Sequence, residues 1–252
     1  MRIDLNADVG ESFGAYAYGD DTAILRSVTS ANVAAGFHAG DPSVIRRTLA
    51  SARELGVAVG AHPSFPDLQG FGRRPMTLDA AEAEDVVLYQ IAAVAGLARA
   101  EGLTLAHVKP HGALYNQAVR ERGLAEAIAR AVHAYDAGLA LFAPPHSALS
   151  SAGRALGLRV VHEGFADRAY LPDGTLVPRT QPGAVIANVE AVVTRAMQMA
   201  TDRTVTAVDG SVLSLDIDTL CVHGDTPGAA SMAAWLRAGL TAAGVDVASP
   251  QR

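Results

Sequence analysis

Short apolar segments alternate with longer amphipathic segments along this chain. The apolar segments hold five or six residues, and most are continuous rather than alternating, which is typical of parallel strands buried on both faces. They span residues 3–7, 32–36, 57–61, 105–109, 138–143, 159–164 and 218–223. The pattern therefore predicts about seven buried strands.

Helical patterns lie between most of these segments. The clearest covers residues 77–102, where apolar side chains recur at helical spacing from Val87 to Ala98, with Thr77 as the expected N-cap and Gly102 as the expected end. The other predicted helices span residues 41–55, 121–135, 146–157, 186–200 and 226–243.

Strand–helix units in alternation imply a parallel sheet with right-handed crossovers. The sequence has no GxGxxG after the first strand and no GxxxxGK[ST], which disfavours the common open nucleotide-binding sheets. We expect a TIM-like (β/α) barrel of about seven parallel strands that forms a single domain over residues 1–252. Residues 164–184 interrupt the rhythm as a long loop, and residues 208–215 as a hairpin.

The composition narrows the class of partner. Half of the 252 residues are apolar and 18% are charged, as in a globular protein with a large core. The net charge of −6 and a pI near 5.7 give no reason to expect nucleic acid or an anionic membrane, so a small polar ligand is expected. The first residues lack the apolar core of a signal peptide, no segment is apolar enough for a membrane span, and Cys221 is the single cysteine. We therefore expect a cytoplasmic location.

Ionisable and amide side chains follow the ends of the predicted strands. In a (β/α) barrel these ends meet on one face, so residues far apart in the sequence form one site. The side chains expected there are Asn6, Asp8, His38, His62, His107, Lys109, His111, Glu163, His223 and Asp225. Asp225 also precedes a helix that begins with proline, where a carboxylate caps the helix and the terminal N–H groups suit an anionic ligand.

Three basic residues stand out beside these strand ends. Lys109 is the only lysine among 20 basic residues, which indicates a role that arginine does not fill, such as a point donor or an amine with a depressed pKa. Arg73 and Arg74 lie in the Gly- and Pro-rich loop 63–75 and are expected to bind a carboxylate or a phosphate.

Two chemistries fit this set of residues. Asp8 and His38, with His62 or His223, are suitable ligands for a divalent metal in a hydrolase that activates water. The alternative is metal-free acid/base and electrostatic catalysis on an amide or phosphoryl group. The residue pattern leaves both open.

Seven motifs are spread over about residues 3–230: LNADVGESFG, NVAAGFHAGDP, GAHPSFPDLQGFGRR, HVKPHGALYN, EGFADRAY, LVPRTQPGAVI and CVHGDTPGA. Together they resemble the LamB/YcsF family of 5-oxoprolinase A subunits. The resemblance implies a barrel related to the sugar deacetylases and an ATP-hydrolysing 5-oxoprolinase, which converts 5-oxo-L-proline to L-glutamate while ATP becomes ADP and phosphate. It also implies partner subunits B and C. A five-membered lactam resists hydrolysis because its leaving amine stays tethered and recloses, which accounts for the ATP.

The resemblance also suggests roles for the site residues. Asp8 or His111 is expected as the general base, while Lys109, Arg73 and Arg74 neutralise the phosphate or the substrate carboxylate. The side chains expected to orient the amide are His38, His62, His107 and His223, with Asn6 and Glu163 fixing the histidine tautomers. Since there is no P-loop, ATP binds either at an unfamiliar site on this chain or on the partner subunits.

Two alternatives remain at this stage. One is a stand-alone metal-dependent deacetylase or amidohydrolase of the same barrel type. The other is a non-catalytic subunit that binds a carboxylated ligand for its partners. The crowd of titratable groups at one face disfavours the second, because binding alone rarely needs so many.

Overall fold

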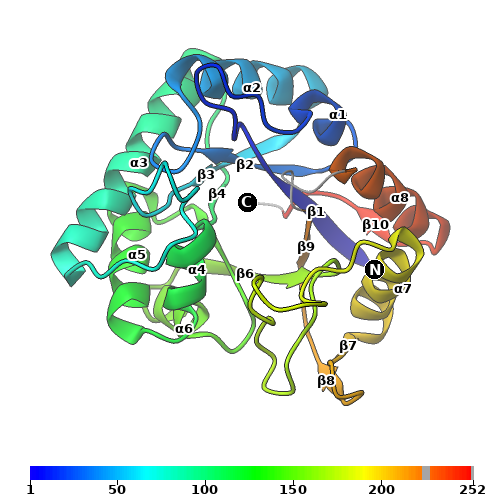
Figure 1. The fold of residues 1–252 in the computed structure, drawn as a ribbon. Coiled ribbons are helices and arrows are strands. Elements are labelled where there is room, and N and C mark those ends of the chain that lie inside the picture. Colours follow the sequence, from blue (N-terminus) through cyan, green and yellow to red (C-terminus); the bar gives the residue numbers. More distant parts are fainter. Residues whose placement is uncertain (223–227, 251–252) are drawn as a thin grey trace.

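The computed structural model describes residues 1–222 and 228–250, and these form a closed barrel of parallel strands surrounded by helices (Figure 1). Seven strands follow one another in the order β1-β2-β3-β4-β5-β6-β9, and β9 pairs with β1, which closes the sheet. The TIM-like barrel of about seven strands predicted from the hydrophobic pattern is confirmed.

Every predicted strand overlaps an observed one. The barrel strands are β1 (Arg2–Val9), β2 (Ser30–Ala34), β3 (Ala58–His62), β4 (His107–Val108), β5 (Ala140–Ala143), β6 (Arg159–Phe165) and β9 (Thr219–Val222). A short strand that was not predicted, β10 (Asp246–Val247), pairs in parallel with the beginning of β1.

The helices cover the outside of the barrel. They are α1 (Asp21–Leu25), α2 (Pro42–Leu55), α3 (Ala80–Ala100), α4 (Gly112–Ala118), α5 (Arg122–Asp136), α6 (Ala148–Ala155), α7 (Val189–Met197), the π-helix η1 (Gln198–Asp202) and α8 (Ala229–Ala242). The short helices α1 and α4 were not predicted, and residues 198–200 of the predicted helix 186–200 belong to the π-helix.

Two helix starts show how the sequence sets the boundaries. Asp41 caps α2 by accepting hydrogen bonds from the backbone N–H groups of Ser43 and Val44, and Pro42 follows at the first helical position, where its missing N–H costs nothing. The N-cap of α3 is Asp79, which accepts from the backbone N–H of Glu82 at 2.8 Å, so the expectation of Thr77 was wrong.

The two predicted interruptions are also seen. After β6 the chain forms no helix or strand before α7, apart from isolated bridges such as Arg168 with Val185, and every residue of this stretch is described. The hairpin consists of β7 (Thr204–Thr206) and β8 (Val212–Ser214), so its first strand lies earlier than the predicted 208–215. No helix in the described part of the chain has the length and hydropathy to cross a membrane.

Candidate functional site

The site begins with the alternation of side chains along β1. Successive residues of a strand point to opposite faces, so Leu5, Ala7 and Val9 join the hydrophobic core beneath the helices, while the polar residues between them face the barrel interior. Asn6 and Asp8 are 0% and 6% exposed. The alternation along β1 thus carries a row of buried polar groups into the centre of the barrel.

Lys109 lies at the centre of these groups. Its Nζ is 2.9 Å from Asp8 Oδ1, 2.9 Å from Glu163 Oε1, 2.9 Å from Cys221 Sγ and 3.2 Å from Asn6 Oδ1. Burial by itself lowers the pKa of Lys109, but the charges of its neighbours, Asp8 first, raise it well above its usual value. Of the two uses expected for this amine, the structure supports the charged point donor and not the depressed pKa.

A chain of amides connects Lys109 with His107. Asn32 on β2 donates from Nδ2 to Asn6 Oδ1 at 2.7 Å and to Asp8 Oδ1 at 2.9 Å, and its Oδ1 lies 2.7 Å from His107 Nε2. Since that oxygen is an acceptor, His107 carries its proton on Nε2. Burial and the nearby Lys109 charge lower the pKa of His107 to about 3, so its ring is neutral and orients Asn32.

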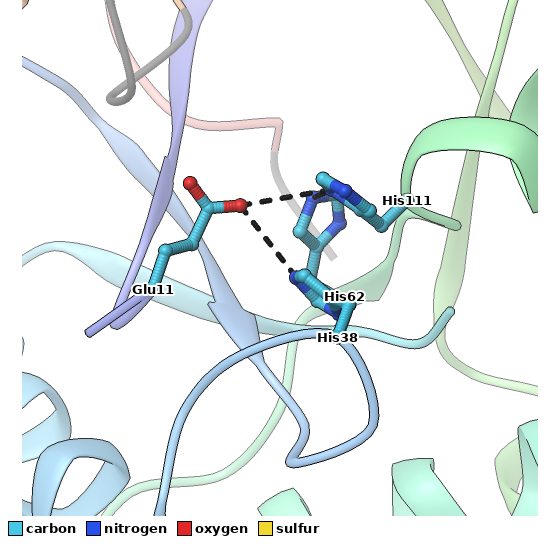
Figure 2. Close-up of side chains that lie close together, drawn as sticks. All are labelled: Glu11, His38, His62 and His111. Carbon is cyan, nitrogen blue, oxygen red and sulfur yellow. Dashed lines mark hydrogen bonds and ion pairs between the residues drawn. The ribbon is translucent and has the colours of Figure 1, made fainter. Parts of the chain in front are cut away.

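A separate cluster of three histidines and one glutamate lies beside Asp8. Its members are Glu11, His38, His62 and His111, and one ligand atom from each lies within 4.8 Å of those of the others (Figure 2). Glu11 comes from the segment after β1, His62 ends β3, and His111 occupies the N-cap position of α4 without a side-chain capping bond. All four side chains are buried. This group could hold a metal ion.

Backbone carbonyls determine the tautomers of two of these histidines. His62 Nδ1 lies 2.6 Å from the Lys109 carbonyl oxygen, and His111 Nε2 lies 2.9 Å from the Phe71 carbonyl oxygen. A carbonyl only accepts, so these two nitrogens carry the protons, in place of the control by Asn6 and Glu163 expected from the sequence. Phe71 presents its carbonyl from a left-handed backbone conformation, with φ of 55°, that is rare for a residue with a side chain.

The remaining nitrogens of His62 and His111 face each other. His111 Nδ1 is 3.0 Å from His62 Nε2, which in turn is 3.4 Å from Asp8 Oδ1. Glu11 Oε1 lies 3.6 Å from His111 Nδ1 and 3.6 Å from His38 Nε2 (Figure 2). The four groups of the cluster therefore converge beside Asp8, and all five side chains are buried.

The His38 ring is held by stacking. It lies parallel to the His111 ring with centroids 3.9 Å apart, and within the described part of the chain neither of its ring nitrogens has a hydrogen-bond partner. Burial, followed by the neighbouring His62, lowers the pKa of His38 well below its usual value; burial, followed by His38, does the same for His111. Both rings are therefore neutral near pH 7.

The remaining predicted site residues lie in different places. Arg73 is exposed, and its guanidinium lies 5.1 Å from the centroid of the Phe71 ring, at the edge of the histidine cluster. Arg74 forms an ion pair with Asp67, with Nε 2.8 Å from Oδ1, so its guanidinium is already engaged by a carboxylate. His223 and Asp225 lie outside the described residues.

Sequence reasoning missed several polar residues of the site. Glu11 was not among the expected site residues, and Asn32 was counted as part of the apolar segment 32–36. Tyr115 donates from its hydroxyl to Glu163 Oε2 at 2.7 Å and so fixes the carboxylate that faces Lys109. In the sequence, inward-facing side chains are indicated by the polar residues at every second position of β1, which include Asp4, Asn6 and Asp8.

Comparisons with known proteins place the barrel among named relatives. The model of the LamB/YcsF family matches residues 3–252. A protein of Methylococcus capsulatus that is named as the A subunit of 5-oxoprolinase is 56% identical over 247 residues, which cover 98% of this chain and 95% of that one. The protein of the same name from Bacillus subtilis is 53% identical over 247 residues, covering 98% and 96%. The crystal structure of a lactam utilization protein from Thermus thermophilus superposes with a TM-score of 0.95 at 50% identity, covering 99% of this chain and 100% of that one.

Proposed function

The chain belongs to the LamB/YcsF family, and from this membership we propose that it is the A subunit of an ATP-dependent 5-oxoprolinase. The observation that carries the proposal is the identity of more than half of the residues, over nearly the whole length of both chains, with proteins named as A subunits of 5-oxoprolinase. The reaction opens the lactam ring of 5-oxo-L-proline to L-glutamate while ATP becomes ADP and phosphate.

The chemistry sets the order of events. Transfer of the terminal phosphoryl group of ATP to the lactam oxygen makes the ring carbon electrophilic and releases ADP. Water then adds to that carbon, and the C–N bond breaks, which gives the amine and an acyl phosphate. A second water molecule hydrolyses the acyl phosphate to glutamate and phosphate. Because the sequence has no P-loop, we assign ATP to the partner subunits B and C of the complex.

We assign the general base to Asp8. Its carboxylate is held at the end of β1 by Asn32 and by Lys109, which leaves it oriented toward the histidine cluster. His111 is less suited to this role, because its Nε2 is bound to the Phe71 carbonyl and its Nδ1 faces His62. In this scheme Asp8 takes the proton from the water that attacks the ring carbon.

Lys109 acts as a positioning residue in this scheme. Its ammonium has three hydrogens and four polar neighbours, so its donors are already used within the protein. Its positive charge holds the carboxyl groups of Asp8 and Glu163 close together, each 2.9 Å from Nζ. At the edge of the site, exposed Arg73 is suited to meet the carboxylate of 5-oxoproline, since a guanidinium binds a carboxylate bidentately.

Reconstitution tests the proposal. Glutamate and ADP release from 5-oxo-L-proline and ATP would be measured with this chain alone, with its B and C partners alone, and with all of them together. We expect coupled release only from the full mixture, and a fall of at least about 100-fold with Asp8→Asn. Asp85→Asn, on the exposed surface of α3, is the matched control and should keep full activity. Equal turnover by the partners without this chain would refute the proposal.

A further inference from the structure

The cluster of Glu11, His38, His62 and His111 has the donor atoms of a metal site. His62 and His111 each give one N–H to a backbone carbonyl and turn the other nitrogen, with its lone pair, toward the centre of the cluster. Histidines that bind metals show this pattern, because the outer hydrogen bond fixes the tautomer and aims the ring. The strained backbone at Phe71 serves one of these two outer bonds.

Two neutral imidazoles do not form a hydrogen bond in this arrangement. His62 Nε2 and His111 Nδ1 are 3.0 Å apart, and with the protons on the opposite nitrogens both are acceptors. Their lone pairs repel each other unless a cation lies between them.

The spacing of the donor atoms suits a single ion. In a tetrahedral site with metal–ligand bonds of about 2.0–2.1 Å, neighbouring ligand atoms lie about 3.3 Å apart. Three of the six separations within the cluster are 3.0 Å, between the two histidine nitrogens, and 3.6 Å, from Glu11 Oε1 to His111 and to His38, and all six lie within 4.8 Å. These three separations lie on both sides of the expected value.

We propose that Glu11, His38, His62 and His111 bind one divalent first-row transition-metal ion, with Zn²⁺ as the best-matched probe. Three imidazole nitrogens and one carboxylate oxygen suit such ions, whereas Mg²⁺ and Ca²⁺ prefer all-oxygen sites. The set differs from the one expected from the sequence, since Glu11 and His111 replace Asp8 and His223. Asp8 is left out of the proposed set because its carboxylate is paired with Lys109, with Oδ1 2.9 Å from Nζ.

The proposal stands apart from the lactam reaction, because the test measures metal and not turnover. Untagged protein would be stripped with a chelator, and Zn²⁺ binding would then be measured by titration calorimetry and metal analysis. We expect about one ion per chain and no competition from a large excess of Mg²⁺. A protein that binds Zn²⁺ but supports no lactam cleavage would refute the function and leave the site intact.

Variants locate the ion. His111→Ala and Glu11→Gln should each weaken Zn²⁺ binding at least about tenfold. His38→Ala should weaken it less than His111→Ala, because the stacked His38 ring must tilt to reach the same ion. His133→Ala is the matched control on the exposed side of α5 and should not change binding.

A crystal of the unaltered chain soaked in Zn²⁺ provides a test that does not depend on the folding of any variant. We expect an anomalous-difference peak between His62 Nε2 and His111 Nδ1. A peak elsewhere, no saturable Zn²⁺ binding, or binding unchanged by folded His111→Ala and Glu11→Gln proteins would overturn the proposal.

Discussion

Asp4 offers the sharpest test of how the polar interior affects stability. Its carboxylate is 1% exposed inside the barrel and accepts hydrogen bonds from three hydroxyl groups, those of Thr29 at 2.6 Å, Ser30 at 2.7 Å and Thr219 at 2.5 Å. None of these partners carries a charge. Burial raises the pKa of Asp4 from 3.8 to about 6, although the hydrogen bonds lower it in part. The change to test is Asp4→Asn.

The direction of the pH effect follows from that pKa. The folded protein holds the proton of Asp4 up to a higher pH than the unfolded chain does, so its contribution to stability is fully present below pH 3.8 and is lost as the pH rises through about 6. The full loss is about 3 kcal/mol, of which about 2 kcal/mol falls between about pH 4.5 and about pH 7. The ordinary aspartate, with a lowered pKa, shows the opposite sign.

Urea unfolding of the unaltered chain and of Asp4→Asn, with chelator present, measures this effect. The difference in unfolding free energy between the two proteins should shift by about 2 kcal/mol in favour of Asp4→Asn from about pH 4.5 to about pH 7. Altered hydrogen bonds add an offset that does not depend on pH. Asp85→Asn is the control and should show a constant difference. A constant difference for Asp4→Asn, or a shift of opposite sign, would show that Asp4 does not titrate as argued.

Three other changes test separate parts of the structure by urea unfolding. Lys109→Met leaves the buried carboxyl groups of Asp8 and Glu163 without their ammonium partner, so it should lower the unfolding free energy by about 3–5 kcal/mol at neutral pH. A loss below about 1 kcal/mol would contradict the central role of the Lys109 charge. Gly60→Ala places a methyl group against the buried His107 ring and should cost about 1–3 kcal/mol, whereas an unchanged stability would mean that the ring can move aside. Asp79→Ala removes the N-cap of α3 and should lower the unfolding free energy by about 1 kcal/mol, while Thr77→Ala should change it by less than about 0.5 kcal/mol. A larger loss for Thr77→Ala than for Asp79→Ala would mean that Thr77 is the cap.

The barrel was predictable because its strands are buried on both faces. Continuous apolar segments joined by helical ones leave few arrangements other than a parallel sheet covered by helices. The helices α1 and α4 have five and seven residues, too few for a helical period to show in the sequence. The start of α3 was misplaced although Asp79 is followed three residues later by Glu82, the spacing of a capping box, because Thr77 is also a good cap.

The site was predictable to the extent that strand ends converge in any such barrel. Asn6, Asp8, His62, Lys109 and Glu163 meet because β1, β3, β4 and β6 deliver them to one interior. Sequence position does not reveal the partner of each side chain. Lys109 was expected to face the ligand, yet its neighbours on β1, β6 and β9 use all of its donors.

The division of the interior into two parts explains why the metal ligands were assigned differently from the sequence. Lys109 supplies a positive charge to Asp8, and a carboxylate paired with an ammonium is a weaker metal ligand than one whose neighbours are imidazoles. Glu11 lies 3.6 Å from His38 and from His111, so it is the carboxylate that joins the imidazoles of the cluster. The orientation of the His62 and His111 rings depends on the backbone carbonyls of Lys109 and Phe71. Every residue has a backbone carbonyl, so the sequence does not show which carbonyls bind a histidine. Lys109 therefore orders the site in two ways: its ammonium binds the Asp8 carboxylate, and its backbone carbonyl fixes the tautomer of His62.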